Sequence, residues 1–213
     1  MGTLNWTPYL FDIGNRQGES GAAVDASVVY TEDGRIEGWV ITEPEYVKKY
    51  QPGAQVPLYF SAVVDKQPDG FGVFNGDNVK QGVRETKGVG AGVYLTYQVK
   101  DSVQVTAKVG LSYTSVENAR INLLKEAENL SFDEVKEQSH QTWENYLGRV
   151  RVETADKNNK IKFYTGLYHA LLGRGLVNDV NGAYPHHNGS IGQLPMEGDK
   201  PVHNVYNLSL IHI

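Results

Sequence analysis

The chain has 213 residues, of which 40% are hydrophobic and 21% charged, and its formal net charge is −5. This length allows one or two domains with their own cores, and the composition is ordinary for a globular protein. The negative charge and the lack of a Lys/Arg-rich block argue against nucleic acid or a membrane surface as the main partner. The sequence has no apolar run of membrane-spanning length, and the absence of cysteine excludes disulfides and thiol catalysis.

The first half of the chain has the pattern of a β domain. Short runs rich in β-branched and aromatic residues alternate with polar turns. The predicted strands cover residues 23–30, 35–42, 56–65, 70–74, 90–99 and 103–112. Between the first two, Asp33 and Gly34 form a typical two-residue hairpin signal. Many short strands without a helical pattern predict an antiparallel sandwich, whose strand order stays open.

After residue 115 the hydrophobic period changes from that of strands to that of helices. Residues 115–129 carry apolar side chains on one side of a predicted helix. Ser131 and Glu134 have the spacing of a capping box, in which each residue satisfies an amide of the other. This predicts a second helix, which ends near Gly148.

A third helix is predicted to open a new structural unit. Residues 149–153 are expected to be a short extended piece, and residues 155–160 a polar hinge. From Phe163 onward, Tyr and Leu residues recur at helical spacing, and Gly173 and Gly175 end the pattern. A loop rich in Asn, Asp, Gly, Tyr and His follows it. Such a loop is typical of a turn, and it is also how a loop lining a sugar site is composed.

Four motifs in this order resemble a known enzyme family. They are residues 108–122 (KVGLSYTSVENARIN), the capping-box helix with Trp143, residues 163–169 (FYTGLYH) and residues 178–184 (NDVNGAY). Together they resemble glycoside hydrolase family 92, the calcium-dependent exo-acting α-mannosidases. The resemblance covers most of the chain and is tightest from residue 108 to residue 207.

The resemblance implies a fold, a reaction and a cofactor. The family joins an N-terminal β-sandwich through a helical linker to an (α/α)6 toroid, with the active site between them. Terminal α-mannosides of glycans are hydrolysed with inversion, using a Glu as general acid, an Asp as general base and a bound calcium ion. Inversion needs the two carboxyl groups to be roughly 6.5–9.5 Å apart, so that a water fits between them. A secreted, periplasmic or cell-surface location is also implied.

The family plan divides this sequence into four parts. Residues 1–115 are expected to be the sandwich, incomplete at its N-terminus, and residues 116–158 the helical linker. Residues 159–207 would begin a truncated toroid, and residues 208–213 (LSLIHI) are interpreted as a non-native tail of translated adapter sequence. No Glu or Asp here matches the family's catalytic residues or calcium ligands. We therefore expect a gene fragment that is inactive by itself.

Three residues in the loop after the first toroid helix are the candidates for substrate binding. Asp179, Asn181 and Tyr184 match the family's loop. Carboxylate and amide oxygens accept bonds from sugar hydroxyls, and a Tyr ring packs against a pyranose face. The alternative is a plain turn in which Asp179 and Asn181 bond their own backbone.

Other conspicuous side chains are expected to be structural. Three histidines suggest a metal site: His186, His187 and His203. Neighbouring histidines in a loop rarely face one ion and calcium prefers oxygen ligands, so we expect no metal here. The aromatic side chains Trp143, Tyr164 and Tyr168 lie on the apolar stripes of their helices and are expected to pack in a core or between domains.

Two alternative functions stay open at this point. One is a carbohydrate-binding β-sandwich module without catalysis of its own. The other is a different glycosidase with the same plan of sandwich and toroid, such as a phosphorylase or a glucoamylase-like enzyme. The motif FYTGLYH followed by NDVNGAY favours the family 92 interpretation, because a shared fold alone does not specify function.

Overall fold

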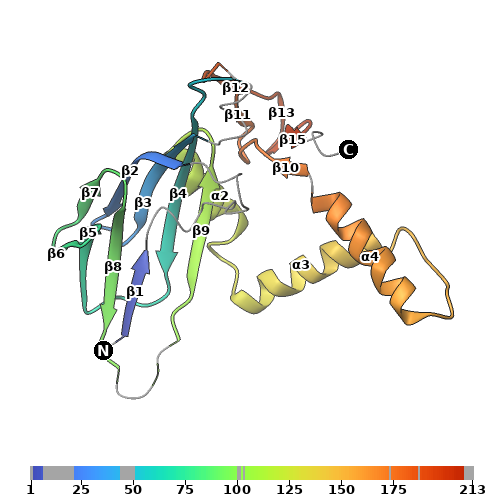
Figure 1. Cartoon of the computed structure of the whole chain (residues 1–213), viewed down its shortest axis with the longest axis horizontal. Coiled ribbons are helices and arrows are strands. Elements are labelled where there is room, and N and C mark those ends of the chain that lie inside the picture. Colours follow the sequence, from blue (N-terminus) through green and yellow to red (C-terminus); the bar gives the residue numbers. More distant parts are fainter. Residues whose placement is uncertain are drawn as a thin grey trace.

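The computed structural model describes residues 2–6, 22–43, 51–99, 102, 104–172, 174–186 and 188–208. Within these ranges the N-terminal half forms two antiparallel sheets, and three helices and several short strands follow them. Figure 1 shows the sheets at one end of the molecule, two helices extending away from them, and the short C-terminal strands near the top of the sandwich.

The larger sheet has five strands and carries the predicted hairpin. In spatial order its strands are β7 (Glu85–Lys87), β2 (Ala22–Tyr30), β3 (Ile36–Glu43), β4 (Val56–Val64) and β9 (Ala107–Ser112). Between β2 and β3 the Thr31 amide donates to the Arg35 carbonyl at 2.8 Å, and Gly34 has φ +84°. Glycine suits this position because a left-handed backbone is cheap only without a Cβ. The predicted hairpin is confirmed, but its loop is longer than two residues, because Tyr30 is the last residue of β2 to pair, and its partner is Ile36.

The smaller sheet has four strands and packs face to face with the larger one. Its order is β1 (Gly2–Trp6), β8 (Ala91–Tyr97), β5 (Gly70–Asn75) and β6 (Asn78–Gln81). Val28 and Phe60 of one sheet and Val93 and Leu95 of the other are all fully buried in one hydrophobic cluster. This shared core confirms the predicted antiparallel sandwich.

Three strands of the sandwich, β1, β6 and β7, lie outside the predicted ones, for a physical reason that is clearest at β6. All four residues of β6 are exposed and three of them are polar. Such a strand has no alternation of apolar and polar side chains to detect. The last predicted strand, residues 103–112, corresponds to β9, which begins later than predicted, at Ala107.

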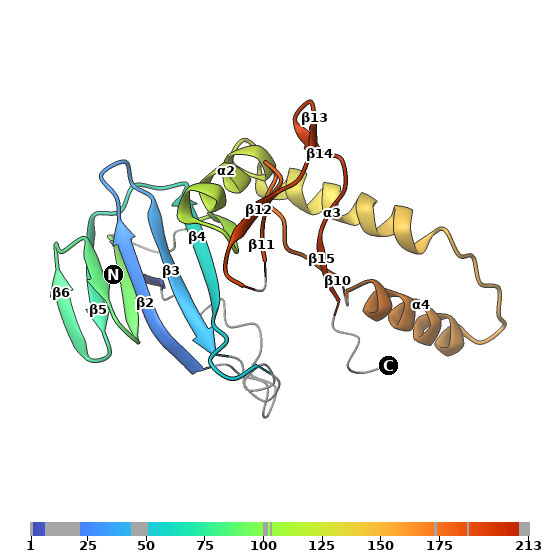
Figure 2. The ribbon, with the colours of Figure 1, turned by 90° about the horizontal axis from the view of Figure 1, so that it is seen from above.

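Helix α2 (Val116–Glu126) lies against the outside of the five-stranded sheet, where it contacts β4 and β9. Ser115, which was predicted to be the first residue of the helix, instead caps it by accepting the Asn118 amide. At Gly110 of β9, a Cβ would lie 2.1 Å from the Ala119 carbonyl oxygen and 2.7 Å from the Leu123 Cβ. The helix therefore sits directly on the strand. Figure 2 shows α2 between the sandwich and the C-terminal strands.

The two remaining helices extend away from the sandwich. Helix α3 (Phe132–Leu147) begins with the predicted capping box, and hydrogen bonds from the Ser131 amide and hydroxyl lower the pKa of Glu134. Helix α4 (Lys157–Leu172) begins earlier than predicted. Asp156 accepts the Asn158 amide at 2.8 Å and starts the helix within the expected hinge. No strand forms over residues 149–153.

Helices α3 and α4 contact each other through aromatic side chains. The ring centroids of Trp143 and Tyr168 lie 4.6 Å apart, and the Tyr164 hydroxyl donates to the Val150 carbonyl at 2.9 Å. The predicted packing of these rings is therefore between the two helices. Neither helix has a buried residue in the described chain, so the predicted core location is wrong for them. None of the helices described is both long and apolar enough to cross a bilayer.

We expect Gly166→Ala to stabilise α4. A Cβ at Gly166 would meet no atom within 4 Å, and alanine is favoured over glycine inside a helix by about 1 kcal/mol. The amides of α4 should then exchange with solvent about fivefold more slowly, which NMR-detected hydrogen exchange measures. Unchanged or faster exchange in α4 would contradict this expectation.

After α4 the chain forms three small two-stranded sheets, where the sequence predicted a loop. The pairs are β10 (Arg174–Leu176) with β15 (Tyr206–Leu208), β11 (Ala183–Pro185) with β12 (Ile191–Gln193), and β13 (Met196–Glu197) with β14 (Lys200–Pro201). The expected helix end at Gly173 and most of the expected tail, residues 209–213, lie outside the described residues. Leu208 is paired with Arg174.

Candidate functional site

The candidate site is built on a tight turn just after β10. The Asp179 amide donates to the Ala183 carbonyl, and the Gly182 amide donates to the Asp179 carbonyl, both at 2.8 Å. Gly182 has φ +84°, which fits a turn closed by a glycine bulge. The Asn181 side-chain oxygen accepts the Ala183 amide at 3.1 Å, as the plain-turn alternative predicts for Asn181. The turn leads directly into β11, which carries Tyr184.

Asp179 is buried, and distant side chains occupy both of its carboxylate oxygens. Its side chain accepts hydrogen bonds from the Ser112 hydroxyl at 2.9 Å, from the Thr114 hydroxyl, and from the Asn122 amide nitrogen at 2.7 Å. Only 3% of the residue is exposed. The plain-turn alternative had Asp179 bonding its own backbone, and the structure shows these long-range bonds instead.

Helix α2 contributes two asparagines to the same network. Asn122 donates to the Leu111 carbonyl at 2.7 Å and accepts the Val180 amide at 3.0 Å. Asn118 donates to the Thr114 hydroxyl at 2.7 Å and accepts from the Asn181 side chain at 2.8 Å. We call the six connected residues the Asp179 network: Ser112, Thr114, Asn118, Asn122, Asp179 and Asn181.

The two asparagines of α2 were not among the site residues predicted from the sequence. Asn118 and Asn122 are four residues apart, so they lie on the same face of the helix. Two asparagines at this spacing, on a helix predicted to follow a β domain, were the signal in the sequence that could have indicated a polar contact surface. Their partners in the turn lie 63 and 57 residues further along the chain.

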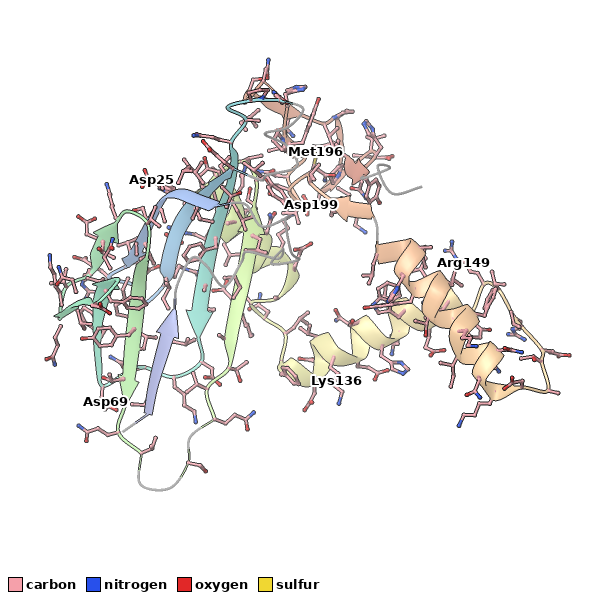
Figure 3. The ribbon with its side chains drawn as sticks, viewed as in Figure 1. Asp25, Asp69, Lys136, Arg149, Met196 and Asp199 are labelled. Atoms are coloured by element: carbon pink, nitrogen blue, oxygen red, sulfur yellow. The ribbon has the colours of Figure 1, made fainter. Side chains whose placement is uncertain are left out.

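A second carboxyl group, Glu126, lies within electrostatic reach of the network. Burial raises the pKa of Glu126, and the negative charge of Asp179 raises it further. At the end of the same helix, the Lys125 amine lies 3.6 Å from the carboxylate of Asp199. Figure 3 shows Met196 in β13 and Asp199 in the turn between β13 and β14. This end of α2 is therefore rich in acidic groups.

We expect Glu126→Gln to raise the melting temperature at neutral pH. Because the folded pKa of Glu126 lies above its ordinary value of 4.5, the folded chain binds a proton more tightly than the unfolded chain. Stability should therefore fall as the pH rises from 4.5 through the raised pKa. The variant removes this loss. Melting curves from pH 4 to 8 measure it, with Glu144→Gln on α3 as the control, and parallel profiles of wild type and Glu126→Gln would contradict it.

Tyr184 and His186 form a small aromatic surface beside the turn. Their ring centroids lie 4.8 Å apart. A Cβ on Gly192 of the paired strand would lie 2.5 Å from the Tyr184 ring and 2.7 Å from His186 Nε2, so the two rings cover this glycine. The side-chain nitrogen of Gln193 donates to the backbone carbonyl of Asn181 at 2.7 Å. Tyr184 is half-buried and His186 is exposed, so part of this aromatic surface is open to solvent.

The described residues do not form a metal site of the kind that calcium requires. No three His, Asp or Glu side chains come together in the part of the chain that the structure describes. The oxygens of Asp179 already accept three hydrogen bonds, whereas calcium takes six to eight oxygen ligands. His203 is exposed, and His187 lies outside the described residues. The calcium that the resemblance implies does not fit the described groups.

Comparison with solved structures finds relatives of the same fold. A family GH92 α-mannosidase from Bacteroides thetaiotaomicron aligns with TM-score 0.73 and 24% identity over 87% of this chain. The GH92 family glycosyl hydrolase ccman5 aligns with TM-score 0.71 and 25% identity over 89%. A family GH92 inverting mannosidase from B. thetaiotaomicron gives 0.69 and 21% over 86%. The chain spans 24% of the length of each. No curated protein matches it.

Comparison with family models gives the same result for both parts of the chain. The model of the glycosyl hydrolase family 92 N-terminal domain matches residues 5–112, just over half of the chain. The model of the family's catalytic domain matches residues 118–209. The Asp179 network joins Ser112 of the first region to Asn122 and Asp179 of the second. This chain belongs to glycosyl hydrolase family 92.

Proposed function

We propose that this chain is part of an exo-acting α-mannosidase that hydrolyses terminal α-mannosides of glycans. It would supply the β-sandwich, the helical linker and the first turn of the catalytic domain. The observation that carries the proposal is the Asp179 network, which holds the turn with Asn181 and Tyr184 at the boundary between the two family regions. Sugar sites are often found between domains.

The relatives support this choice of substrate and stereochemistry. One structure is of a B. thetaiotaomicron α-mannosidase in complex with mannoimidazole, and another is of an inverting mannosidase. An inverting reaction needs one carboxylic acid to protonate the leaving oxygen and one carboxylate to activate a water on the opposite face. We assign neither role to the buried turn carboxylate, Asp179, because both of its oxygens are occupied.

We propose that Asn181 and Tyr184 border the sugar and that Asp179 acts behind them. Tyr184 can pack against a pyranose face, and the neighbouring side-chain amide of Asn181 offers polar groups at its edge. Asp179 has no free lone pair directed at solvent, since it is buried among Ser112, Thr114 and Asn122. The calcium requirement of the family is also proposed for the whole enzyme, with ligands other than the residues described here.

Two assays on this chain test the proposal. Incubation with 4-nitrophenyl α-mannoside, with calcium or with chelator, is expected to release no nitrophenol above the blank. An NMR titration with methyl α-mannoside is expected to shift the amides around Asn181 and Tyr184, and methyl α-galactoside serves as the control sugar. Calcium-dependent release would overturn the proposed inactivity. Shifts confined to the sandwich would instead favour the carbohydrate-binding module, and no shift at any amide would overturn a sugar-facing turn.

A further inference from the structure

Asp179 differs from the other buried carboxylate in the described chain by its lack of a cation. Glu37 is bound by the Arg120 guanidinium through two hydrogen bonds, at 2.8 and 2.7 Å. The hydrogen bonds to the Asp179 side chain come from two hydroxyls and one amide, all neutral donors. Burying a carboxylate without a cation is costly unless its hydrogen bonds are well formed. The network therefore has to be well formed for Asp179 to remain in place.

The donors around Asp179 come from three separate parts of the chain. Ser112 ends β9, Thr114 lies between β9 and α2, and Asn122 belongs to α2. Ser112 and Asp179 are 67 residues apart in sequence. A single side chain thus connects the sandwich edge, the first helix and the turn that follows α4.

The orientation of each amide in the network depends on Asp179 being an acceptor at both oxygens. Asn122 presents its nitrogen to Asp179 and its oxygen to the Val180 amide. An asparagine at position 179 would direct a donor either at the Asn122 nitrogen or at the two hydroxyls. In both cases a buried donor loses its acceptor, which costs more than the loss of one ordinary hydrogen bond.

We infer that Asp179 is a positioning residue, which fixes the turn 179–184 on α2 and so holds Asn181 and Tyr184 in place. The Val180 amide bound to Asn122 and the Asn181 side chain bound to Asn118 are the two further points of attachment. That the positioned side chains face a sugar rests on the proposed function. The positioning itself concerns contacts within this chain and can be measured without substrate.

The test is a swap of the two side chains that face each other. In Asp179→Asn the two amide nitrogens of residues 122 and 179 oppose each other, and in Asn122→Asp two carboxylates do. In the double variant the new amide at 179 can donate to the new carboxylate at 122 and still accept from Ser112 and Thr114. The bond from residue 122 to the Leu111 carbonyl is lost in Asn122→Asp and in the double variant alike, so its loss cancels in the comparison. We expect each single variant to accelerate hydrogen exchange of the Val180 amide by about tenfold or more, and the double variant to accelerate it by about tenfold less than the product of both.

Controls separate local positioning from general destabilisation. The amide chemical shifts of Val93 and Leu95 should stay unchanged in the single variants, because displacement of the turn leaves the sandwich core in place, whereas the shifts of residues 179–184 should move. Asp199→Asn, an exposed carboxylate in the β13–β14 turn, should leave the Val180 amide unchanged. If Asp179→Asn does not fold, the milder Ser112→Ala and Thr114→Val variants are expected to show the same local acceleration.

Three results would overturn the inference. They are unchanged Val180 exchange in Asp179→Asn, single effects that multiply in the double variant, or chemical-shift changes as large in the sandwich core as in the turn. Failure of the proposed function has a different signature. In that case the wild-type chain would show a protected Val180 amide but no shift of the turn with methyl α-mannoside.

Discussion

Replacing Arg120 with alanine is expected to lower the free energy of unfolding by about 3 kcal/mol. Glu37 on β3 is 4% exposed, and its carboxylate oxygens accept hydrogen bonds from Arg120 Nε at 2.8 Å and Nη2 at 2.7 Å. The Ser61 hydroxyl adds a third at 2.8 Å. Without Arg120, the carboxylate stays buried with Ser61 as its remaining bond among those described. Urea unfolding followed by tryptophan fluorescence measures the loss.

Two further variants separate the loss of the ion pair from other effects. Arg149→Ala removes an exposed guanidinium that lies over the Tyr146 ring, and it should cost no more than about 1 kcal/mol. In Glu37→Gln combined with Arg120→Ala no charge remains buried, so the double variant should be more stable than Arg120→Ala alone. An Arg120→Ala protein as stable as Arg149→Ala would show that the pair does not hold α2 on the sheet.

Gly110→Ala is expected to have an effect of similar or greater size, because it pushes α2 off the sheet. The added Cβ would lie 2.1 Å from the Ala119 carbonyl oxygen and 2.7 Å from the Leu123 amide nitrogen, both backbone atoms. Overpacking of a core costs about 1–3 kcal/mol and occasionally more. We expect at least the upper end of this range, since a helix backbone cannot yield as a side chain does. Thermal and urea unfolding measure it.

The matched control for Gly110→Ala is Gly166→Ala, which places the same methyl group in open space and should not destabilise the chain. A second variant locates the collision. Trimming Leu123 to alanine in the Gly110→Ala background should not restore stability, because the nearest atom belongs to the backbone of Ala119. Recovery of stability by this trimming would contradict the proposed cause.

The features that the sequence predicted correctly depend on neighbours in the chain. The hairpin at Gly34 follows from a two-residue turn signal, and the capping box of Ser131 and Glu134 from a spacing of three residues. The β-sandwich follows from repeated short alternating runs. Strand β6 was missed because its exposed polar residues carry no such pattern, and α4 began early because Asp156 caps it.

The candidate site was predicted in part, and the missing part is long-range. The bond of Asn181 to the Ala183 amide is local, and the plain-turn alternative included it. The partners of Asp179 lie 57 to 67 residues away, so no local pattern indicates them. Likewise, the Tyr184 ring over Gly192 depends on the pairing of β11 with β12. The roles of Asp179, Asn181 and Tyr184 toward a sugar stay predictions.

The central claim is that the turn 179–184 and the sandwich form one packed unit through α2. Native-state hydrogen exchange of the unmodified chain tests this claim most directly. The amides of Val180 and Ala183 are bonded to Asn122 and Asn181. We predict that they exchange with the same free energy of opening as the core amides of Val93 and Leu95, well after those of α4. Exchange of Val180 and Ala183 together with α4, while the sandwich core stays protected, would contradict the account.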